Sequence, residues 1–372
     1  MPEDTAGPPI LLNPGPVNLS ARVRQALLQP DLCHREAEYF ELQDSVRAQL
    51  LDVYGLPSSR WVAALLAGSG TAAAEAMLSS LVGAGGRVLV IENGTYGRRL
   101  AAIAQAHGIS CSVARFEWDE EVPPSRVAAA IDADPSITHL AVVHHETTTG
   151  RLNPIEELGQ VCRSRGLSLL VDAVSSFGAE EIDFERWGLG ACAGSAGKCL
   201  HGIPGLAFVV VRRTELQRGC RPSRTVYLDL LRYAETQESG DTPFTPAVHG
   251  FFALDEALRE LAETGGWRAR RRRYTWLAER TRGWLAELGV EPLIGPSESS
   301  CVLRSYRLPP GVEYRPLHDR LKQLGFVIYA GQGPLEGEVF RISTMGAIDD
   351  ADLERFRAAL CECLATYDTS LT

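Results

Sequence analysis

The sequence predicts an α/β protein with a mostly parallel sheet flanked by helices, followed by a smaller α+β domain. Between about residues 60 and 212, short β-rich runs alternate with helical patterns. Several of these runs are apolar throughout, which is typical of strands buried on both faces of a parallel sheet. The chain has 372 residues, which is longer than one average domain, so a second, smaller domain is expected.

The expected strands follow one another at short intervals. They are WVAALLA (61–67), RVLVIE (87–92), HLAVVHH (139–145), LSLLVDA (167–173), ACAGSA (191–196) and LAFVVVR (206–212). Helices at 71–82 and 153–166 are expected to cover the sheet. Another helix is expected to start at Ser20, after the proline-broken segment 11–20. These patterns do not define the order of the strands.

The organisation changes toward the C-terminus, where a long helical run is followed by three apolar segments and two further helices. These expected elements lie at 267–289, 301–308, 315–324, 325–330, 338–344 and 349–366. We therefore predict an extended N-terminal arm (1–20), a large domain (21–265) and a small C-terminal domain (266–372).

Composition narrows the possible functions. The formal net charge of −10 argues against a nucleic-acid-binding protein, and the run RARRRR (268–273) is better explained as the solvated face of a helix. No apolar segment approaches the roughly 20 residues of a membrane-spanning helix. The N-terminal residues lack a basic stretch followed by an apolar run, so no signal peptide is expected. The nine cysteines form no CxxC pair, which predicts reduced thiols and a cytoplasmic protein.

The segment GSGT (68–71) ends one expected strand and opens an alanine-rich helix. Glycines let a ligand approach the backbone, and a helix N-terminus offers free N–H groups and the positive end of a dipole. With the hydroxyls of Ser69 and Thr71, this segment can cradle a phosphate group. An ordinary strand-to-helix turn with Thr71 near the N-cap explains the same residues.

Two further segments carry chemically active side chains. Asp172 ends an apolar run, at the edge where open α/β sheets bind ligands; its carboxylate can hold a proton on a partner nitrogen or cap a local turn. Lys198 lies among small residues in GSAGKCLHG, and the chain has only one other lysine, Lys322. Burial would lower the pKa of Lys198 and favour a nucleophilic amine, whereas a surface lysine in a flexible loop is the alternative.

In combination, these segments match the requirements of a pyridoxal phosphate site. The phosphate cradle would anchor the cofactor, Asp172 would keep the pyridine nitrogen protonated, and Lys198 would form the covalent link. Tyr96, in NGTYG, can stack on the pyridine ring, although an ordinary loop tyrosine also fits. The segment HHE (144–146) is not expected to bind a metal, because adjacent strand residues point to opposite faces.

Longer stretches carry a family resemblance that runs almost from end to end. They are LLNPGPVNLS, GSGTAAAEAML, NGTYGRR, HHETTTGRLNPI, VDAVSSFGAEEIDF, SAGKCLHGIPGLAFVVVRR, FTPAVHG, LGFVIYAG and FRISTMG. Through ETTTGxLNPI, DAxSSFG and KCxxGxPG, in this order, the chain resembles the class V pyridoxal phosphate-dependent aminotransferases. The resemblance implies the fold-type I transferase fold, pyridoxal 5′-phosphate as cofactor, and a homodimer with shared active sites.

The resemblance also implies roles around the cofactor. Lys198 would bond the cofactor and later move a proton, and Asp172 would pair with the pyridinium nitrogen. Ser69, Gly70 and Thr71 would contact the cofactor phosphate. Tyr96 would stack on the ring, and a hydroxyl of Thr147 or Thr148 would contact the phenolic oxygen.

Two implied contacts reach beyond the cofactor pocket. Thr245, in FTPAVHG, would reach the phosphate of the cofactor in the neighbouring subunit, and Arg341, in FRIST, would bind the substrate anion by a forked contact. The chain has Asn13, Gly197 and His201 where the family usually has threonine, asparagine and glutamine. These departures concern the amino donor more than the cofactor.

The resemblance implies, as the leading prediction, reversible amino transfer from 2-aminoethylphosphonate to pyruvate, which gives phosphonoacetaldehyde and L-alanine, in phosphonate metabolism. The alternatives keep the chemistry and change the substrate, as in alanine– or serine–glyoxylate transamination or with another aminophosphonate. A pyridoxal phosphate-dependent lyase and a non-catalytic relative are further alternatives. The presence of Lys198, Asp172 and Arg341 together argues against a non-catalytic relative.

Overall fold

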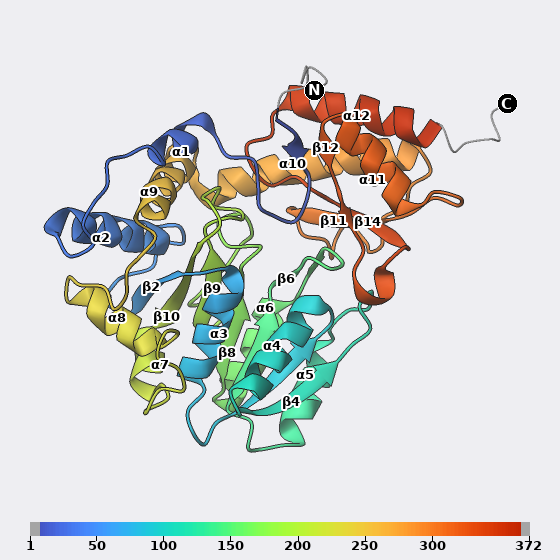
Figure 1. The fold of residues 1–372 in the computed structure, drawn as a ribbon. Coiled ribbons are helices and arrows are strands. Elements are labelled where there is room, and N and C mark those ends of the chain that lie inside the picture. Colours follow the sequence, from blue (N-terminus) through green and yellow to red (C-terminus); the bar gives the residue numbers. More distant parts are fainter. Residues whose placement is uncertain (1–7, 366–372) are drawn as a thin grey trace.

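The computed structural model describes residues 8–365, and its centre is a seven-stranded sheet (Figure 1). The strands lie in the order β2-β10-β9-β8-β5-β3-β4. Their bounds are Trp61–Ala67 (β2), Arg87–Glu92 (β3), Ser110–Arg115 (β4), His139–Val143 (β5), Ser168–Asp172 (β8), Leu189–Ser195 (β9) and Leu206–Arg212 (β10). All neighbours pair in parallel except that β10 is antiparallel to both β2 and β9. The predicted α/β fold with a mostly parallel sheet is confirmed.

Helices bury both faces of this sheet, which explains why its inner strands are apolar throughout. In β2, Val62 and Ala64 pack toward one helix layer, while Trp61 and Ala63 pack toward the other. The first layer contains α3 (Gly70–Leu81), α4 (Thr95–Ala106) and α8 (Leu230–Glu238). The second contains α2 (Ala37–Asp52), α5 (Pro124–Asp132), α6 (Ile155–Arg165) and α9 (Val248–Glu263). Two short helices are α1 (Ala21–Ala26), which Ser20 caps as predicted, and α7 (Arg213–Arg218).

The structure corrects the expected strands at two places. The edge strand β4 was not predicted, because its sequence SCSVAR is largely polar and its side chains are only partly buried. The strand expected at 139–145 ends at Val143. The chain then turns into a small hairpin of β6 (His145–Glu146) and β7 (Arg151–Leu152).

The C-terminal elements lie together above the seven-stranded sheet (Figure 1). A three-stranded antiparallel sheet has the order β11-β14-β13, and β1 of the N-terminal arm pairs in parallel with β12. The elements are β1 (Ile10–Leu11), α10 (Gly266–Glu287), β11 (Leu303–Arg307), α11 (Tyr314–Gln323), β12 (Phe326–Val327), β13 (Tyr329–Ala330), the 3-10 helix η1 (Gly333–Leu335), β14 (Val339–Ser343) and α12 (Asp350–Ala365).

These C-terminal elements enclose a hydrophobic core of their own. It draws on residues 274–364, on Leu12 and Val17 of the arm, and on Ala179 and Cys199 from the sheet side. The domain boundaries at residues 20 and 265 stay predictions, and the terminal parts of the predicted arm and small domain, 1–7 and 366–372, lie outside the described residues. Within residues 8–365, no helix is both long and apolar enough to cross a membrane.

Candidate active site

The side chains singled out in the sequence gather at the carboxyl ends of three neighbouring strands. Strand β8 lies between β5 and β9, with Asp172 beside Val143 on one side and beside Ala193 on the other. Because these strands run parallel, the segments that follow them emerge at one edge of the sheet, where open α/β sheets bind ligands. Residues 144–150 follow β5, and Lys198 follows β9.

The turn that carries Lys198 joins β9 to β10 and is tightly packed. Ala196 N donates to Leu206 O at 3.0 Å at the base of the turn. A Cβ on Gly197 would lie 2.9 Å from the backbone nitrogen of Pro204, closer than real Cβ contacts. Glycine at 197, one of the three departures from the family, therefore has a packing reason.

The N-terminal arm crosses directly over the lysine. The Lys198 amine donates a hydrogen bond to the carbonyl oxygen of Pro14, and a Cβ on Gly15 would lie 2.6 Å from Lys198 Nζ. Burial lowers the pKa of Lys198, and the charges of Cys199 and Asp172 oppose that shift. The amine is thus shifted toward its neutral, nucleophilic form.

The same turn is tied to the C-terminal elements. Arg270 of α10 is buried and donates from Nη1 to Cys199 O at 2.5 Å. The His201 imidazole contacts the Tyr274 hydroxyl, and its Nε2 accepts from Gly346 N at 3.1 Å. The prediction of a solvated arginine face at 268–273 was therefore wrong for Arg270.

Asp172 stands at the last position of β8 with its carboxylate buried. Its Oδ1 accepts from Val174 N at 3.0 Å. Burial raises the pKa of Asp172 to about 6, while the Val174 N–H partly opposes that shift. A carboxylate held out of water in this way binds a protonated nitrogen more strongly than it would in solvent.

Beside it, Glu146 is a fully buried carboxylate that joins the end of β5 to the start of α4. It accepts from the backbone nitrogens of Tyr96 at 3.1 Å and Gly97 at 3.2 Å. It also accepts from Thr148, from N at 3.1 Å and from Oγ1 at 2.5 Å. Thr95 N in turn donates to Thr148 Oγ1 at 3.1 Å. Burial raises the pKa of Glu146, and its four donors oppose that shift. The Glu146 carboxyl group therefore caps the N-terminus of α4 and fixes the loop 146–150.

Arg341 of β14 reaches the site from the C-terminal elements and is fully buried. Its Nε donates to Ala330 O at 2.8 Å and its Nη1 to Thr147 O at 2.9 Å. The guanidinium carbon lies 5.0 Å from the centre of the Tyr329 ring. Two of its donors are thus engaged by backbone carbonyls, which hold the positive charge in one orientation.

At the start of α3, Ser69 is the N-cap and Gly70 is the first helical residue. A Cβ on Gly70 would lie 2.4 Å from a methyl carbon of Val174, so the helix start approaches the β8 end closely. Thr71 Oγ1 accepts from Arg99 at 3.1 Å. The Arg99 guanidinium also lies over the Tyr96 ring, at 4.7 Å from its centre. Helix N–H groups, two hydroxyls and an arginine suit a phosphate group.

Among residues 8–365, nine buried side-chain polar atoms have no hydrogen-bond partner, and three of them lie near Lys198. They are Asn13 Oδ1, His145 Nε2 and Arg341 Nη2. Buried polar groups are nearly always paired in native proteins, so unpaired atoms gathered at one place indicate a ligand site. Together with the amine, the carboxylate and the helix N-terminus, they fit a phosphorylated aldehyde cofactor and an anionic substrate.

Comparisons with known proteins agree with this geometry. The sequence model of the class-V aminotransferases matches residues 29–308. Two relatives are named 2-aminoethylphosphonate–pyruvate transaminase: one from Vibrio vulnificus is 37% identical, over 94% of this chain and 96% of the relative, and one from Syntrophobacter fumaroxidans is 38% identical, over 97% of both. The crystal structure of an aspartate aminotransferase from Thermus thermophilus superposes with a TM-score of 0.88 at 31% identity, covering 96% of this chain and 99% of that chain.

The chain belongs to the class-V aminotransferase family. It is therefore a pyridoxal phosphate-dependent enzyme of the fold-type I architecture. The buried amine of Lys198, the strand-end carboxylate of Asp172 and the α3 start are the groups of this aminotransferase that suit pyridoxal phosphate. Within residues 8–365, no cluster of three or more histidine, cysteine, aspartate or glutamate side chains could hold a metal ion.

Thr245 differs from the other predicted site residues of the aminotransferase. It is exposed in the segment between α8 and α9. Arg35 ties this region to the segment before α2, since its Nη1 contacts Asp241 and donates to Thr242 O at 2.8 Å. The structure thus brings together the other predicted residues within one chain, and it leaves Thr245 on the surface.

Sequence reasoning missed three contributors to the site. Glu146 follows the two histidines considered as metal ligands, yet its four hydrogen bonds depend on the position of α4. Arg99 is part of the segment NGTYGRR. Its position one turn into a helix that starts at the site could have indicated its role. The role of the Pro14 carbonyl could not be predicted from the sequence, because every residue type has a backbone carbonyl oxygen.

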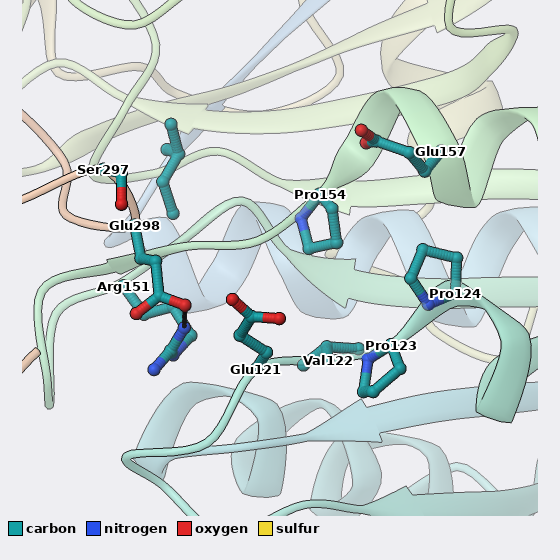
Figure 2. A pocket seen from close by; sticks show the side chains of 10 residues that line it. Glu121, Val122, Pro123, Pro124, Arg151, Pro154, Glu157, Ser297 and Glu298 are labelled. Carbon is teal, nitrogen blue, oxygen red and sulfur yellow. Dashed lines mark ion pairs between the residues drawn. The ribbon is translucent and has the colours of Figure 1, made fainter. Parts of the chain in front are cut away.

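A separate hollow of about 310 Å³ is lined by Arg151, Pro154 and Glu298, among others (Figure 2). Arg151 stands at its edge, with Nη1 3.3 Å from a Glu298 carboxylate oxygen and Nη2 donating to Asp119 O at 2.7 Å. Leu152 N also donates to Glu298 O at 2.8 Å. These contacts brace the hairpin that ends the loop 146–150, and none of the residues that line the hollow is a predicted cofactor or substrate contact.

Replacing Asp172 with asparagine is expected to stabilise the cofactor-free protein near neutral pH. The pKa of Asp172 is about 6 in the folded protein and 3.8 as the unperturbed value. Folding therefore takes up a proton between these values, and the wild type loses stability as pH rises through them. Asparagine does not ionise, so Asp172→Asn should gain about 1–3 kcal/mol of unfolding free energy relative to wild type between pH 4 and pH 7.

Urea unfolding of the cofactor-free proteins at several pH values measures this difference. Asp132→Asn is the matched control. Its exposed carboxylate has a pKa lowered by the hydrogen bond from Arg165, so that variant should lose relative stability as the pH rises. A stability difference between Asp172→Asn and wild type that stays constant from pH 4 to pH 7 would contradict the buried state of Asp172.

Proposed function

We propose that the chain transfers the amino group of 2-aminoethylphosphonate to pyruvate, reversibly, and forms phosphonoacetaldehyde and L-alanine. The observation that carries this proposal is the near-complete coverage, at 37–38% identity, by relatives that bear the name of this activity. The substrates are then a small aminophosphonate and a keto acid, and the reaction belongs to phosphonate metabolism.

Lys198 and Asp172 carry the chemistry in this proposal. Bound pyridoxal phosphate supplies an aldehyde that takes up the amine and a ring that withdraws electrons from the amine-bearing carbon. Lys198 would hold the cofactor through Nζ, and its free amine would take the proton from the amine-bearing carbon of the donor. Asp172 pairs with the protonated pyridine nitrogen, and the low polarity that raises its pKa strengthens this pairing.

The proposed cofactor contacts follow from the elements that carry them. Ser69, Gly70 and Thr71 present helix N–H groups and hydroxyls to the phosphate, and Tyr96 stacks on the ring. The Thr148 hydroxyl already contacts Glu146 and Thr95. Of the two threonines, Thr147 is therefore the better candidate for the phenolic oxygen.

Arg341 is the proposed binding site for the substrate anion. Its Nη2 has no partner in the part of the chain that the structure describes, while Nε and Nη1 hold the guanidinium in place. A planar arginine fork suits both the phosphonate of the donor and the carboxylate of pyruvate. One site can thus serve both half-reactions, because each substrate carries its anion beyond the reacting carbon.

We further propose that the enzyme is a cytoplasmic homodimer with shared active sites. Thr245, exposed in one subunit, would contact the phosphate bound to its partner. The exposed position of Thr245 supports this proposal, because a threonine that served only its own subunit's site would lie among the other cofactor contacts.

The second candidate is the same chemistry on another donor, such as alanine or serine with glyoxylate. A crystal structure named alanine–glyoxylate aminotransferase, from Nostoc, supports this candidate, since it superposes with a TM-score of 0.89 at 26% identity, covering 98% of this chain and 97% of that chain. Asn13, Gly197 and His201, the departures from the family, lie around Lys198 and bear on donor choice.

Addition of single amino donors without keto acid tests the substrate assignment. The purified, cofactor-loaded enzyme should lose its visible absorbance band with 2-aminoethylphosphonate, and also with alanine because the reaction is reversible. Serine should leave the band unchanged. If serine bleaches the band and 2-aminoethylphosphonate does not, the aminotransferase stands and the phosphonate assignment falls.

Arg341→Ala should lower kcat/KM for 2-aminoethylphosphonate by about 100-fold or more, because a buried charged fork is removed. Cofactor affinity should change far less. Steady-state kinetics and cofactor titration measure the two effects, with Arg307→Ala as the control, since Arg307 is exposed on the neighbouring strand β11. Loss of cofactor with unchanged donor kinetics would show that Arg341 does not bind the substrate anion.

A further inference from the structure

His145 is a buried histidine at the site for which the proposed function has no use. Its side chain is 1% exposed. Nδ1 lies 3.3 Å from the backbone carbonyl oxygen of Ser175, and Nε2 has no hydrogen-bond partner among the described residues 8–365. Ser175 Oγ donates to His145 O at 2.9 Å, so backbone and ring are both held against the segment that follows β8.

The Ser175 carbonyl determines which nitrogen of the ring carries the proton. A carbonyl oxygen only accepts hydrogen bonds, so Nδ1 must be the protonated nitrogen of the neutral ring. Burial lowers the pKa of His145 to about 4, which keeps the ring neutral at physiological pH. Nε2 is then a hydrogen-bond acceptor, in a buried place where an unpaired acceptor is costly.

The His145 ring, with its acceptor Nε2, lies in the surroundings of Lys198. Ser175 O, which accepts from His145, also accepts from Cys199 Sγ at 3.2 Å, and Cys199 is the residue after the lysine. The positive charge of Lys198 further lowers the pKa of His145, which indicates that the two side chains share one low-dielectric region.

A protonated lysine has donors to spare here. An ammonium group carries three N–H donors, and the Pro14 carbonyl accepts from Lys198 in the described structure. The other two donors of the ammonium group therefore remain for further acceptors near the strand ends.

We propose that His145 is a positioning residue that accepts, at Nε2, a hydrogen bond from the protonated nitrogen held at Lys198. This inference rests on the proposed role of Lys198 as the cofactor lysine. The bond stabilises the protonated form of that nitrogen and orients it over the end of β8. His145 thereby sets the pH at which the lysine becomes a nucleophile and a base.

Other charged groups act on the same nitrogen and remain in place when His145 is changed. Asp172 and Cys199 raise the pKa of Lys198, whereas Arg341 and Arg99 lower it, and burial lowers it most. These effects on the pKa of Lys198 are the same in the wild type and in the variants. A difference in that pKa between wild type and variant therefore reports on His145.

The neighbouring His144 is the matched control. It is equally buried, but its Nδ1 lies 3.0 Å from Ser176 Oγ and its ring packs edge-on against Trp187. It therefore points away from the lysine, as the sequence predicts for adjacent residues. His144→Asn should leave the titration of Lys198 unchanged.

Two replacements of His145 separate the proposed role from a purely structural one. His145→Gln places an amide near the position of Nε2 and gives up the Ser175 bond, whereas His145→Asn keeps an amide near Nδ1 and gives up the acceptor. If Nε2 accepts a hydrogen bond from Lys198, His145→Asn should shift the pKa of Lys198 and His145→Gln should preserve it. If the Ser175 bond alone matters, the order reverses.

Competitive labelling of the cofactor-free protein with a small amine-reactive reagent, followed by peptide mass spectrometry, gives the pKa of Lys198. The exposed Lys322 serves as the internal standard. In His145→Asn the pKa of Lys198 should fall by about one unit or more, the value of one hydrogen bond to a charged group. The pH midpoint of the visible band of the cofactor-loaded enzyme should shift in the same direction.

Because the labelling needs no cofactor, its result is independent of whether the proposed substrates are correct. An unchanged Lys198 titration in folded His145→Asn, in both states, would overturn the proposal. Nitrogen NMR of the wild type gives a second test that needs no variant. A proton on Nδ1 with Nε2 unprotonated is expected, and a proton on Nε2 would also overturn the proposal.

Discussion

Four charged side chains are held largely out of water at one edge of the central sheet, and most features of the site follow from that constraint. Lys198 and Arg341 bring positive charge, while Asp172 and Glu146 bring negative charge. Removing charges from water is costly unless each finds partners. The backbone supplies many of these partners: three backbone N–H groups donate to Glu146, one donates to Asp172, and carbonyls accept from Lys198 and from Nε and Nη1 of Arg341.

This constraint explains why the site lies between two hydrophobic cores. Strand β8 of the sheet presents Asp172, the hairpin after β5 presents Glu146, and β14 presents Arg341 from the C-terminal elements. The lysine turn belongs to both parts, since Cys199 packs in the C-terminal core while β9 and β10 lie in the sheet. Neither part alone holds the complete set of charges, so the relative placement of the two parts controls the chemistry.

Much of this arrangement could be predicted from the sequence because the relevant signals are local. Apolar runs defined the inner strands, and Asp172 and Lys198 stood out by their positions at strand ends and among small residues. The edge strand β4 was missed because its partial exposure permits a polar sequence. Glu146 and Arg270 were misread because their partners, the start of α4 and the Cys199 carbonyl, come from elements far away in the chain. Long-range partners of this kind leave no periodic pattern.

The most direct test of the account uses the scarcity of lysine in the chain. Borohydride reduction of the cofactor-loaded protein fixes the pyridoxyl group on the lysine that carries it, and peptide mass spectrometry then identifies that lysine. Only Lys198 and Lys322 are available, so the measurement has few outcomes. We predict that the label is found on Lys198. A label on Lys322 alone, or no reducible cofactor, would contradict the assignment of this site.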